Sequence, residues 1–179
     1  MDILVARHGQ TEWNLLKKVQ GKADIDLNET GKNQAFLTAK NLEHEKIDLI
    51  ISSPLKRALH TAQIINRERN IPIIIDERIA ERNFGEFEGK STSDFNYEEF
   101  WSYKVNKKYN EAENIKDFFD RTYKFLDEIK ETYRNKKILI VTHGGVSISI
   151  KCYFSEIPDI DTLFPLCIGN CEVEKFENI

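Results

Sequence analysis

The chain has 179 residues, a hydrophobic content of 40% and a formal net charge of −4 at pH 7. This length suits one domain with a sizeable core and is short for two, so we expect a single domain over residues 1–179. Basic and acidic residues are interspersed, which indicates no basic face for nucleic acid, and no apolar run approaches the length of a membrane span.

Two apolar runs of strand length, at opposite ends of the chain, each lead into a histidine. Residues 3–6 precede Arg7 and His8, and residues 138–142 precede His143. Such continuous runs are typical of strands buried on both faces of a sheet. Ligands of open α/β sheets bind outside the carboxyl ends of parallel strands, so neighbouring strands would bring both histidines to one crevice. The sequence therefore predicts an anion site built from two imidazoles and one guanidinium.

The segment after the first strand predicts a substrate lip and then a helix and a strand. A polar loop contains Gln20 and Gly21, and we interpret it as the lip. Apolar spacing then predicts a helix over residues 30–45 and a strand over residues 48–51.

A second helix is predicted to begin at Ser52-Ser53-Pro54, because serine can cap a helix and proline fits its first position. Arg57 falls in the first turn of this helix, away from the apolar stripe. A cation there opposes the helix dipole, so the position favours a ligand contact. The alternative is a solvated surface arginine.

The second half of the chain continues the alternation of strands and helices. We predict a strand over residues 72–75, a glycine-containing loop over residues 79–89 and a helical insertion over the site at residues 91–113. An amphipathic helix over residues 114–133 and a helix after His143, over residues 146–154, follow. The last helix starts just after His143, and its free N–H groups would point into the same crevice and offer a place for an anion. This alternation predicts a three-layer α/β/α sandwich with a mainly parallel central sheet.

The C-terminal tail predicts an edge hairpin formed by residues 166–168 and 172–176. Such a hairpin would either pair with a second copy, giving a homodimer, or finish the sheet edge. The three cysteines all lie late in the chain, at Cys152, Cys167 and Cys171. An odd, clustered set disfavours a disulfide framework and favours a reducing, cytoplasmic setting.

Five blocks of the chain resemble the histidine phosphatase superfamily, in its phosphoglycerate-mutase-like branch, and occur in the order of that family. They are Arg7–Asn14, Leu27–Gly31, Ser52–Ala58, Glu81–Arg82 with Gly85 and Gly89, and Thr142–Gly145. Residues 91–113 and the C-terminal tail lie outside the resemblance. The resemblance implies the phosphoglycerate-mutase-like fold and a small phosphorylated metabolite as substrate.

The resemblance also implies a role for each matching residue. His8 would be the nucleophile, and Glu81 would donate a proton to the leaving group. The phosphate oxygens would be held by Arg7, Arg57 and His143, and the pocket would be completed by Asn14, the Gln20–Gly21 backbone and Gly144.

The chemistry of phosphate monoesters requires such a set of groups. The doubly charged ester repels a nucleophile unless cations neutralise its oxygens, and two arginines with an imidazolium can do so without a metal or cofactor. His8 must attack as a neutral imidazole, and we expect its other ring nitrogen to bond to a backbone carbonyl. Glu81 can hold a proton for the departing alkoxide because the adjacent phosphate opposes its ionisation, and it can then activate water.

Other interpretations of these residues stay open at this point. The two histidines could be core residues that bond to the backbone, and Glu81 could form a surface ion pair with Arg82. The histidines lie far apart in sequence, and no His-Glu-x-x-His pattern occurs, so we expect no metal site.

The stretch from residue 91 to residue 113 bears on the choice between a phosphatase and a mutase. It contains no arginine, whereas the mutases of the family carry adjacent arginines there for the substrate carboxylate. We therefore predict a phosphomonoesterase that is either broad in substrate or similar to the α-ribazole phosphatases. An apolar or ring-bearing part of the substrate would contact Phe84, Phe87, Tyr97 or Trp101. The alternatives are a phosphoglycerate mutase and a non-catalytic phospholigand-binding module.

Overall fold

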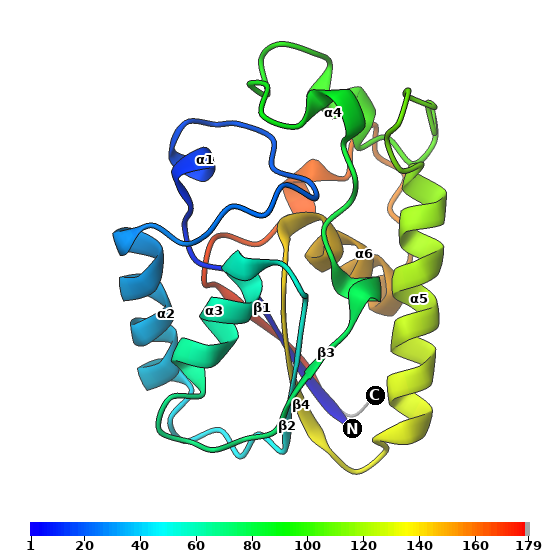
Figure 1. Ribbon diagram of the computed structural model, residues 1–179. Coiled ribbons are helices and arrows are strands. Elements are labelled where there is room, and N and C mark those ends of the chain that lie inside the picture. The colour runs from blue at the N-terminus through cyan, green and yellow to red at the C-terminus, as the bar shows by residue number, and fades with distance from the viewer. Residues whose placement is uncertain (178–179) are drawn as a thin grey trace.

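A five-stranded sheet with the strand order β3-β2-β4-β1-β5 forms the centre of the protein (Figure 1). The computed structural model describes residues 1–177. The strands are β1 (Asp2–Arg7), β2 (Leu49–Ser52), β3 (Ile73–Ile75), β4 (Lys137–Thr142) and β5 (Val173–Phe176). The first four are parallel to their neighbours, and β5 is antiparallel to β1.

Six α-helices and three short 3₁₀ helices connect the strands within residues 1–177. The α-helices are α1 (Glu12–Leu15), α2 (Glu29–Asn41), α3 (Lys56–Ile65), α4 (Tyr97–Phe100), α5 (Ile115–Thr132) and α6 (Gly144–Ser155). The 3₁₀ helices are η1 (Glu77–Ile79), η2 (Gly85–Phe87) and η3 (Phe164–Leu166). None of these helices is both long and apolar enough to cross a membrane.

The strands are apolar on both faces because helices cover both faces of the sheet. Successive side chains of a strand point to opposite faces. Ile3 and Val5 of β1 accordingly belong to the core that includes α5 and α6, whereas Leu4 and Ala6 belong to the core that includes α3. Figure 1 shows α2 and α3 on one side of the sheet and α5 and α6 on the other. The predicted α/β/α sandwich with a mainly parallel sheet is confirmed.

Strands β1 and β4 are direct neighbours, and this pairing positions the candidate site. Arg7 pairs with Thr142 in the parallel register, so both strands end at the same edge of the sheet. His8 and His143 follow immediately, and the His8 N–H extends the ladder by donating to the Thr142 carbonyl at 2.9 Å. The predicted convergence of the two histidines is therefore confirmed.

Helix α3 begins two residues later than the Ser-Ser-Pro pattern predicts. Ser53 is still bound to the sheet, because its N–H donates to the Val141 carbonyl at 3.0 Å. Its hydroxyl lies 2.7 Å from Nε2 of His143 and accepts from the N–H of Leu55 at 3.3 Å, before the first residue of the helix. Leu55, with an extended backbone, takes the N-cap position.

The predicted helical insertion over residues 91–113 is mostly turns and irregular chain, with only the four residues of α4 helical. Asn106 and Glu111 adopt φ angles of 47° and 57°, which a right-handed helix does not contain. The segment is held instead by aromatic packing. The Phe100 ring stacks on Phe84 at 4.5 Å, and the Phe95 ring stacks on Phe87 at 4.3 Å between centroids.

The predicted tail hairpin is wrong, because its first arm is not a strand. Leu166 ends η3, and the Ile168 carbonyl accepts a hydrogen bond from Nη1 of Arg7 at 2.9 Å. Only β5 is extended, and it pairs with β1 as the antiparallel edge of the sheet. The homodimer stays a prediction.

Candidate active site

A cavity of about 350 Å³ lies where β1 and its neighbours end, and most of the predicted site residues line it. These are Arg7, His8, Asn14, Gln20, Gly21, Arg57 and Glu81. His143 and Gly144 do not line the cavity. His143 lies next to His8 with 5.2 Å between the ring centroids, and a Cβ added at Gly144 would lie 3.5 Å from the Arg7 guanidinium.

His8 is buried and held in one tautomer. Its Nδ1 lies 2.7 Å from the carbonyl oxygen of Gly9. A carbonyl can only accept a hydrogen bond, so Nδ1 carries the proton and Nε2 keeps its lone pair. Burial, followed by the charges of Arg57 and Arg7, holds the pKa of His8 well below its usual range. The ring is therefore neutral at neutral pH.

Arg7 presents a donor that no group in residues 1–177 satisfies. Its Nη1 donates to the Ile168 carbonyl at 2.9 Å and contacts Sγ of Cys167 at 3.5 Å. Its Nε is buried and has no hydrogen-bond partner in the described part of the chain. A buried donor without a partner is costly, so Nε of Arg7 is a polar group whose burial the described residues do not compensate.

Arg57 of α3 is completely buried and binds the loop that contains Gln20 and Gly21. Its Nη2 and Nη1 donate to the carbonyls of Gly21 and Ala23, each at 2.7 Å. Its Nε donates to Nδ1 of His143 at 3.2 Å. Burial lowers the pKa of Arg57 to about 10, so the side chain still carries its charge at neutral pH. A solvated surface arginine is thus excluded.

His143 is neutral in the free protein, which differs from the imidazolium predicted from the sequence. Nδ1 accepts from Arg57, so the ring proton lies on Nε2, which donates to the Ser53 hydroxyl at 2.7 Å. Burial, then the charge of Arg57 and the effect of His8, hold the pKa of His143 well below its usual range. In this state the ring supports Arg57 through a hydrogen bond rather than adding a charge.

Glu81 is held by two backbone N–H groups and does not pair with Arg82. Its Oε2 accepts from the N–H of Gly145 at 3.0 Å, at the start of α6, and its Oε1 accepts from the N–H of Arg82 at 2.9 Å. A Cβ at position 145 would lie 2.4 Å from Oε1 of Glu81, so only glycine permits this approach. The Arg82 guanidinium is buried and donates to the Phe100 carbonyl at 2.5 Å.

The family model of the histidine phosphatase superfamily (branch 1) matches residues 3–178. The chain belongs to this superfamily. It is 36% identical over 176 residues to the uncharacterized phosphatase PhoE of Bacillus subtilis, covering 95% of this chain and 87% of that protein. It is 34% identical over 150 residues to phosphoserine phosphatase 1 of Hydrogenobacter thermophilus, covering 79% of this chain and 70% of that protein.

Among solved structures, Bacillus stearothermophilus YhfR superposes on this chain with a TM-score of 0.90 and 31% identity. The match covers 98% of this chain and 90% of that chain. Membership of the superfamily, together with relatives that are named phosphatases, supports a phosphatase activity.

Several residues that shape the site were not predicted from the sequence. Trp13, Thr92 and Phe164 line the cavity. Ser53 binds His143, and Gly145 binds Glu81. Gly145 could have been noticed, because it follows the His143-Gly144 pair directly. The others carry no local signal, because their roles depend on which distant segment packs against them.

Acid is expected to destabilise the protein below about pH 6.5, because His8 and His143 are neutral when folded and titrate near that pH when unfolded. Their folded pKa values are lowered, so this stability is complete above about pH 6.5 and is lost as the pH falls. The unfolding free energy should fall by at most about 1.4 kcal/mol per pH unit for each histidine. Urea unfolding between about pH 7.5 and about pH 5.5 measures this slope.

Substitution of each histidine tests the origin of that slope. His8→Ala and His143→Gln should each make the dependence on pH shallower, whereas His44→Gln, at an exposed position, should leave it unchanged. An unchanged slope in both buried-site variants would contradict this assignment.

Proposed function

We propose that the protein hydrolyses phosphate monoesters of a small metabolite through a phosphohistidine at His8, without a metal or cofactor. The observation that carries this proposal is the state of His8. Its Nδ1 is engaged by Gly9, its Nε2 has no partner in residues 1–177, and the cavity around it is also lined by Arg7 and Arg57. A neutral imidazole beside two guanidinium groups is suited to attack on a dianionic phosphate.

In the first step, Nε2 of His8 forms a bond to phosphorus while the bond from phosphorus to the alcohol oxygen breaks. Glu81 gives its proton to that oxygen, so the product leaves as a neutral alcohol. Arg7 and Arg57 neutralise the phosphoryl oxygens and hold the group in line. The Gly9 carbonyl accepts from Nδ1 and so stabilises the positive charge that develops on the ring.

In the second step, a water oxygen forms a bond to phosphorus while the bond from phosphorus to Nε2 breaks. Glu81, now ionised, takes a proton from that water, and inorganic phosphate is released. We propose that His143 acts on the phosphoryl group through Arg57, which it orients by a hydrogen bond. We assign Asn14, Gln20, Gly21 and Gly144 to binding of the phosphoryl group.

The cations in the cavity walls are Arg7, Arg57, Lys17 and Lys18, and none of them comes from residues 91–113. The composition of this segment is what supports a phosphatase rather than a mutase. Residues 91–113 supply Thr92 and Tyr97 to the cavity and contain no arginine for a substrate carboxylate. Of the aromatic residues expected near the substrate, Phe84 and Tyr97 line the cavity, and Phe87 and Trp101 do not. We therefore propose a small ester with an apolar or ring-bearing part, for an enzyme that is either broad in substrate or similar to the α-ribazole phosphatases.

Hydrolysis of p-nitrophenyl phosphate in excess EDTA tests this function. We expect release of inorganic phosphate at an unchanged rate when EDTA is added, because the cations of the site belong to the protein. Within residues 1–177, no three or more His, Cys, Asp or Glu side chains gather in a way that could hold a metal ion. Loss of activity in EDTA that added divalent metal restores would contradict the metal-independent mechanism.

Two further outcomes separate the alternative functions. Interconversion of 3- and 2-phosphoglycerate after priming by the bisphosphate, with little hydrolysis, would identify a mutase. Vanadate binding without turnover of any ester would identify a binding module.

A further inference from the structure

The backbone around Glu81 is held by side chains rather than by regular secondary structure. Residues 80–84 belong to no helix or strand. The two backbone N–H groups that bind the Glu81 carboxylate come from Arg82 and Gly145. The carboxylate can therefore keep its place only if residues 80–82 keep theirs relative to α6. Since buried backbone groups need partners, the groups that hold this segment can be identified.

One guanidinium from α5 binds three carbonyls of this segment. Nη1 of Arg121 donates to the Arg78 carbonyl at 2.5 Å, and Nη2 donates to the carbonyls of Ala80 and Glu81 at 2.9 and 3.2 Å. The carbonyl between them, that of Ile79, accepts from the Thr142 hydroxyl of β4 at 2.7 Å. Four successive carbonyls are thus bound by side chains, three of them by Arg121.

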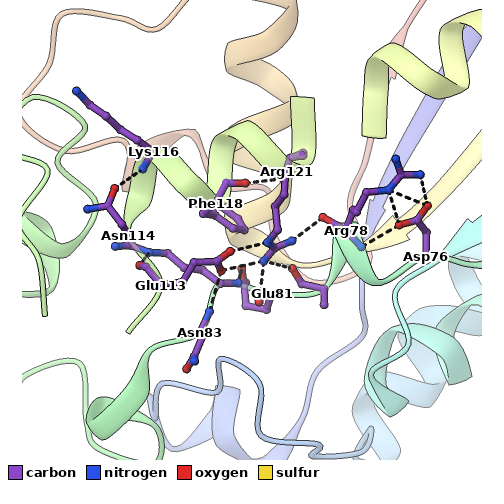
Figure 2. Close-up of polar contacts among 12 residues, drawn as sticks. Asp76, Arg78, Glu81, Asn83, Glu113, Asn114, Lys116, Phe118 and Arg121 are labelled. Atoms are coloured by element: carbon purple, nitrogen blue, oxygen red, sulfur yellow. Dashed lines mark hydrogen bonds and ion pairs between the residues drawn. The ribbon is translucent and has the colours of Figure 1, made fainter. Parts of the chain in front are cut away.

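Glu113 fixes the orientation of Arg121 and binds the chain on the other side of Glu81. Its Oε1 and Oε2 accept from Nε and Nη2 of Arg121 at 2.6 and 3.0 Å, which makes a bidentate ion pair. Its Oε2 also accepts from the N–H of Asn83 at 3.2 Å, and its own N–H donates to the Asn83 carbonyl at 2.9 Å. Figure 2 shows Arg121 between Glu113 and the chain that carries Glu81.

We propose that Arg121 and Glu113 form a positioning pair that sets the carboxylate of Glu81 against the leaving group. Neither residue lines the cavity, so neither is placed to touch the substrate. Their side chains are only 21% and 18% exposed, which makes this ion pair less solvated than most surface pairs. This inference rests on the proposed function, because it assigns to the pair the placement of the proton donor of that reaction.

The proposal predicts a loss of activity that depends on the leaving group. p-Nitrophenyl phosphate and phenyl phosphate have similar shapes, but phenol is the weaker acid and needs a proton donor more. For Arg121→Met we expect kcat/KM to fall on the order of tenfold more for phenyl phosphate than for the nitrophenyl ester. The ratio kcat/KM reports the steps through loss of the alcohol, so slow hydrolysis of phosphohistidine does not mask the effect.

Arg78→Met is the matched control. Arg78 lies on the same segment, is 30% exposed, and pairs with Asp76 and Glu128 instead of binding the Glu81 backbone. Its removal should destabilise the protein without altering the ratio of kcat/KM for the two esters. A loss that is equal for both esters in Arg121→Met would show a merely structural role and overturn the proposal.

A double variant provides a second readout. Glu81→Gln removes the proton donor, so adding Arg121→Met should produce little further loss for phenyl phosphate. Full additivity of the two losses would overturn the proposal. If Arg121→Met does not fold, Glu113→Gln carries the same test, with the same dependence on the leaving group expected and an equal loss counting against it. An unmodified protein that hydrolyses neither ester would instead contradict the proposed function itself, and with it the role of the pair.

Discussion

Replacing His8 with alanine is expected to lower kcat/KM for phosphate monoesters on the order of 10⁴-fold to 10⁶-fold, because His8 is the only imidazole among the described residues that line the cavity. Radiolabelled substrate, quenched with alkali during turnover, should leave label on the unmodified protein and none on His8→Ala. The label should be stable in base and labile in acid, as expected of a phosphoramidate bond and not of a phosphoester.

The matched control for His8 is His60→Ala. His60 is 42% exposed, and its Nδ1 lies 2.7 Å from Oδ1 of Asp26, outside the residues that line the cavity. This variant should keep both turnover and labelling. Retained hydrolysis in His8→Ala, or label that stays attached to it, would refute His8 as the nucleophile.

Replacing Arg57 with methionine is expected to lower kcat/KM by about 10²-fold to 10³-fold, the usual effect of losing one donor to transition-state charge. Arg57 also binds the Gly21 and Ala23 carbonyls and His143, so the lip and the second imidazole lose their support together. Arg57→Lys should be intermediate, because lysine keeps the charge but cannot reproduce the planar fork. Vanadate affinity should fall in the same order as kcat/KM.

Arg67→Met is the control for Arg57. Arg67 lies just beyond α3, is exposed, and its guanidinium packs on the Phe36 ring with 5.7 Å to the ring centroid. The Arg67→Met variant should bind vanadate and hydrolyse esters as the unmodified protein does. Urea unfolding separates lost folding from lost binding. A stable Arg57→Met variant with unchanged vanadate affinity would show that Arg57 does not bind the phosphoryl group.

Prediction from the sequence succeeded where a feature is encoded over a few adjacent residues. The apolar runs before His8 and His143 predicted the two central parallel strands, because strands covered on both faces need no polar alternation. Arg57, a cation in the first turn of a helix, stood out as locally unfavourable. Its burial in the site agrees with the general rule that local inconsistencies mark functional positions.

Prediction failed where the outcome depends on a distant partner. The Ser-Ser-Pro pattern predicted an earlier start for α3, but Ser53 stays bound to β4 and His143, and Leu55 takes the N-cap position. The aromatic segment over residues 91–113 predicted a helix, but its rings pack on Phe84 and Phe87, which lie outside the segment. In both places the structure depends on contacts with distant residues, so it cannot be predicted from local helix propensity.

By itself, the amino-acid sequence determined the two central strands, the layered α/β architecture and the candidate residues at the strand ends, because side-chain periodicity and polarity are properties of adjacent residues. Only the tertiary structure decided the charge state of His143, which depends on burial and on Arg57. It also decided the contact between Arg121 and the backbone of Glu81, two residues 40 positions apart. Hydrogen bonds and desolvation of this kind exist only after distant segments have packed together, so no local pattern could encode them.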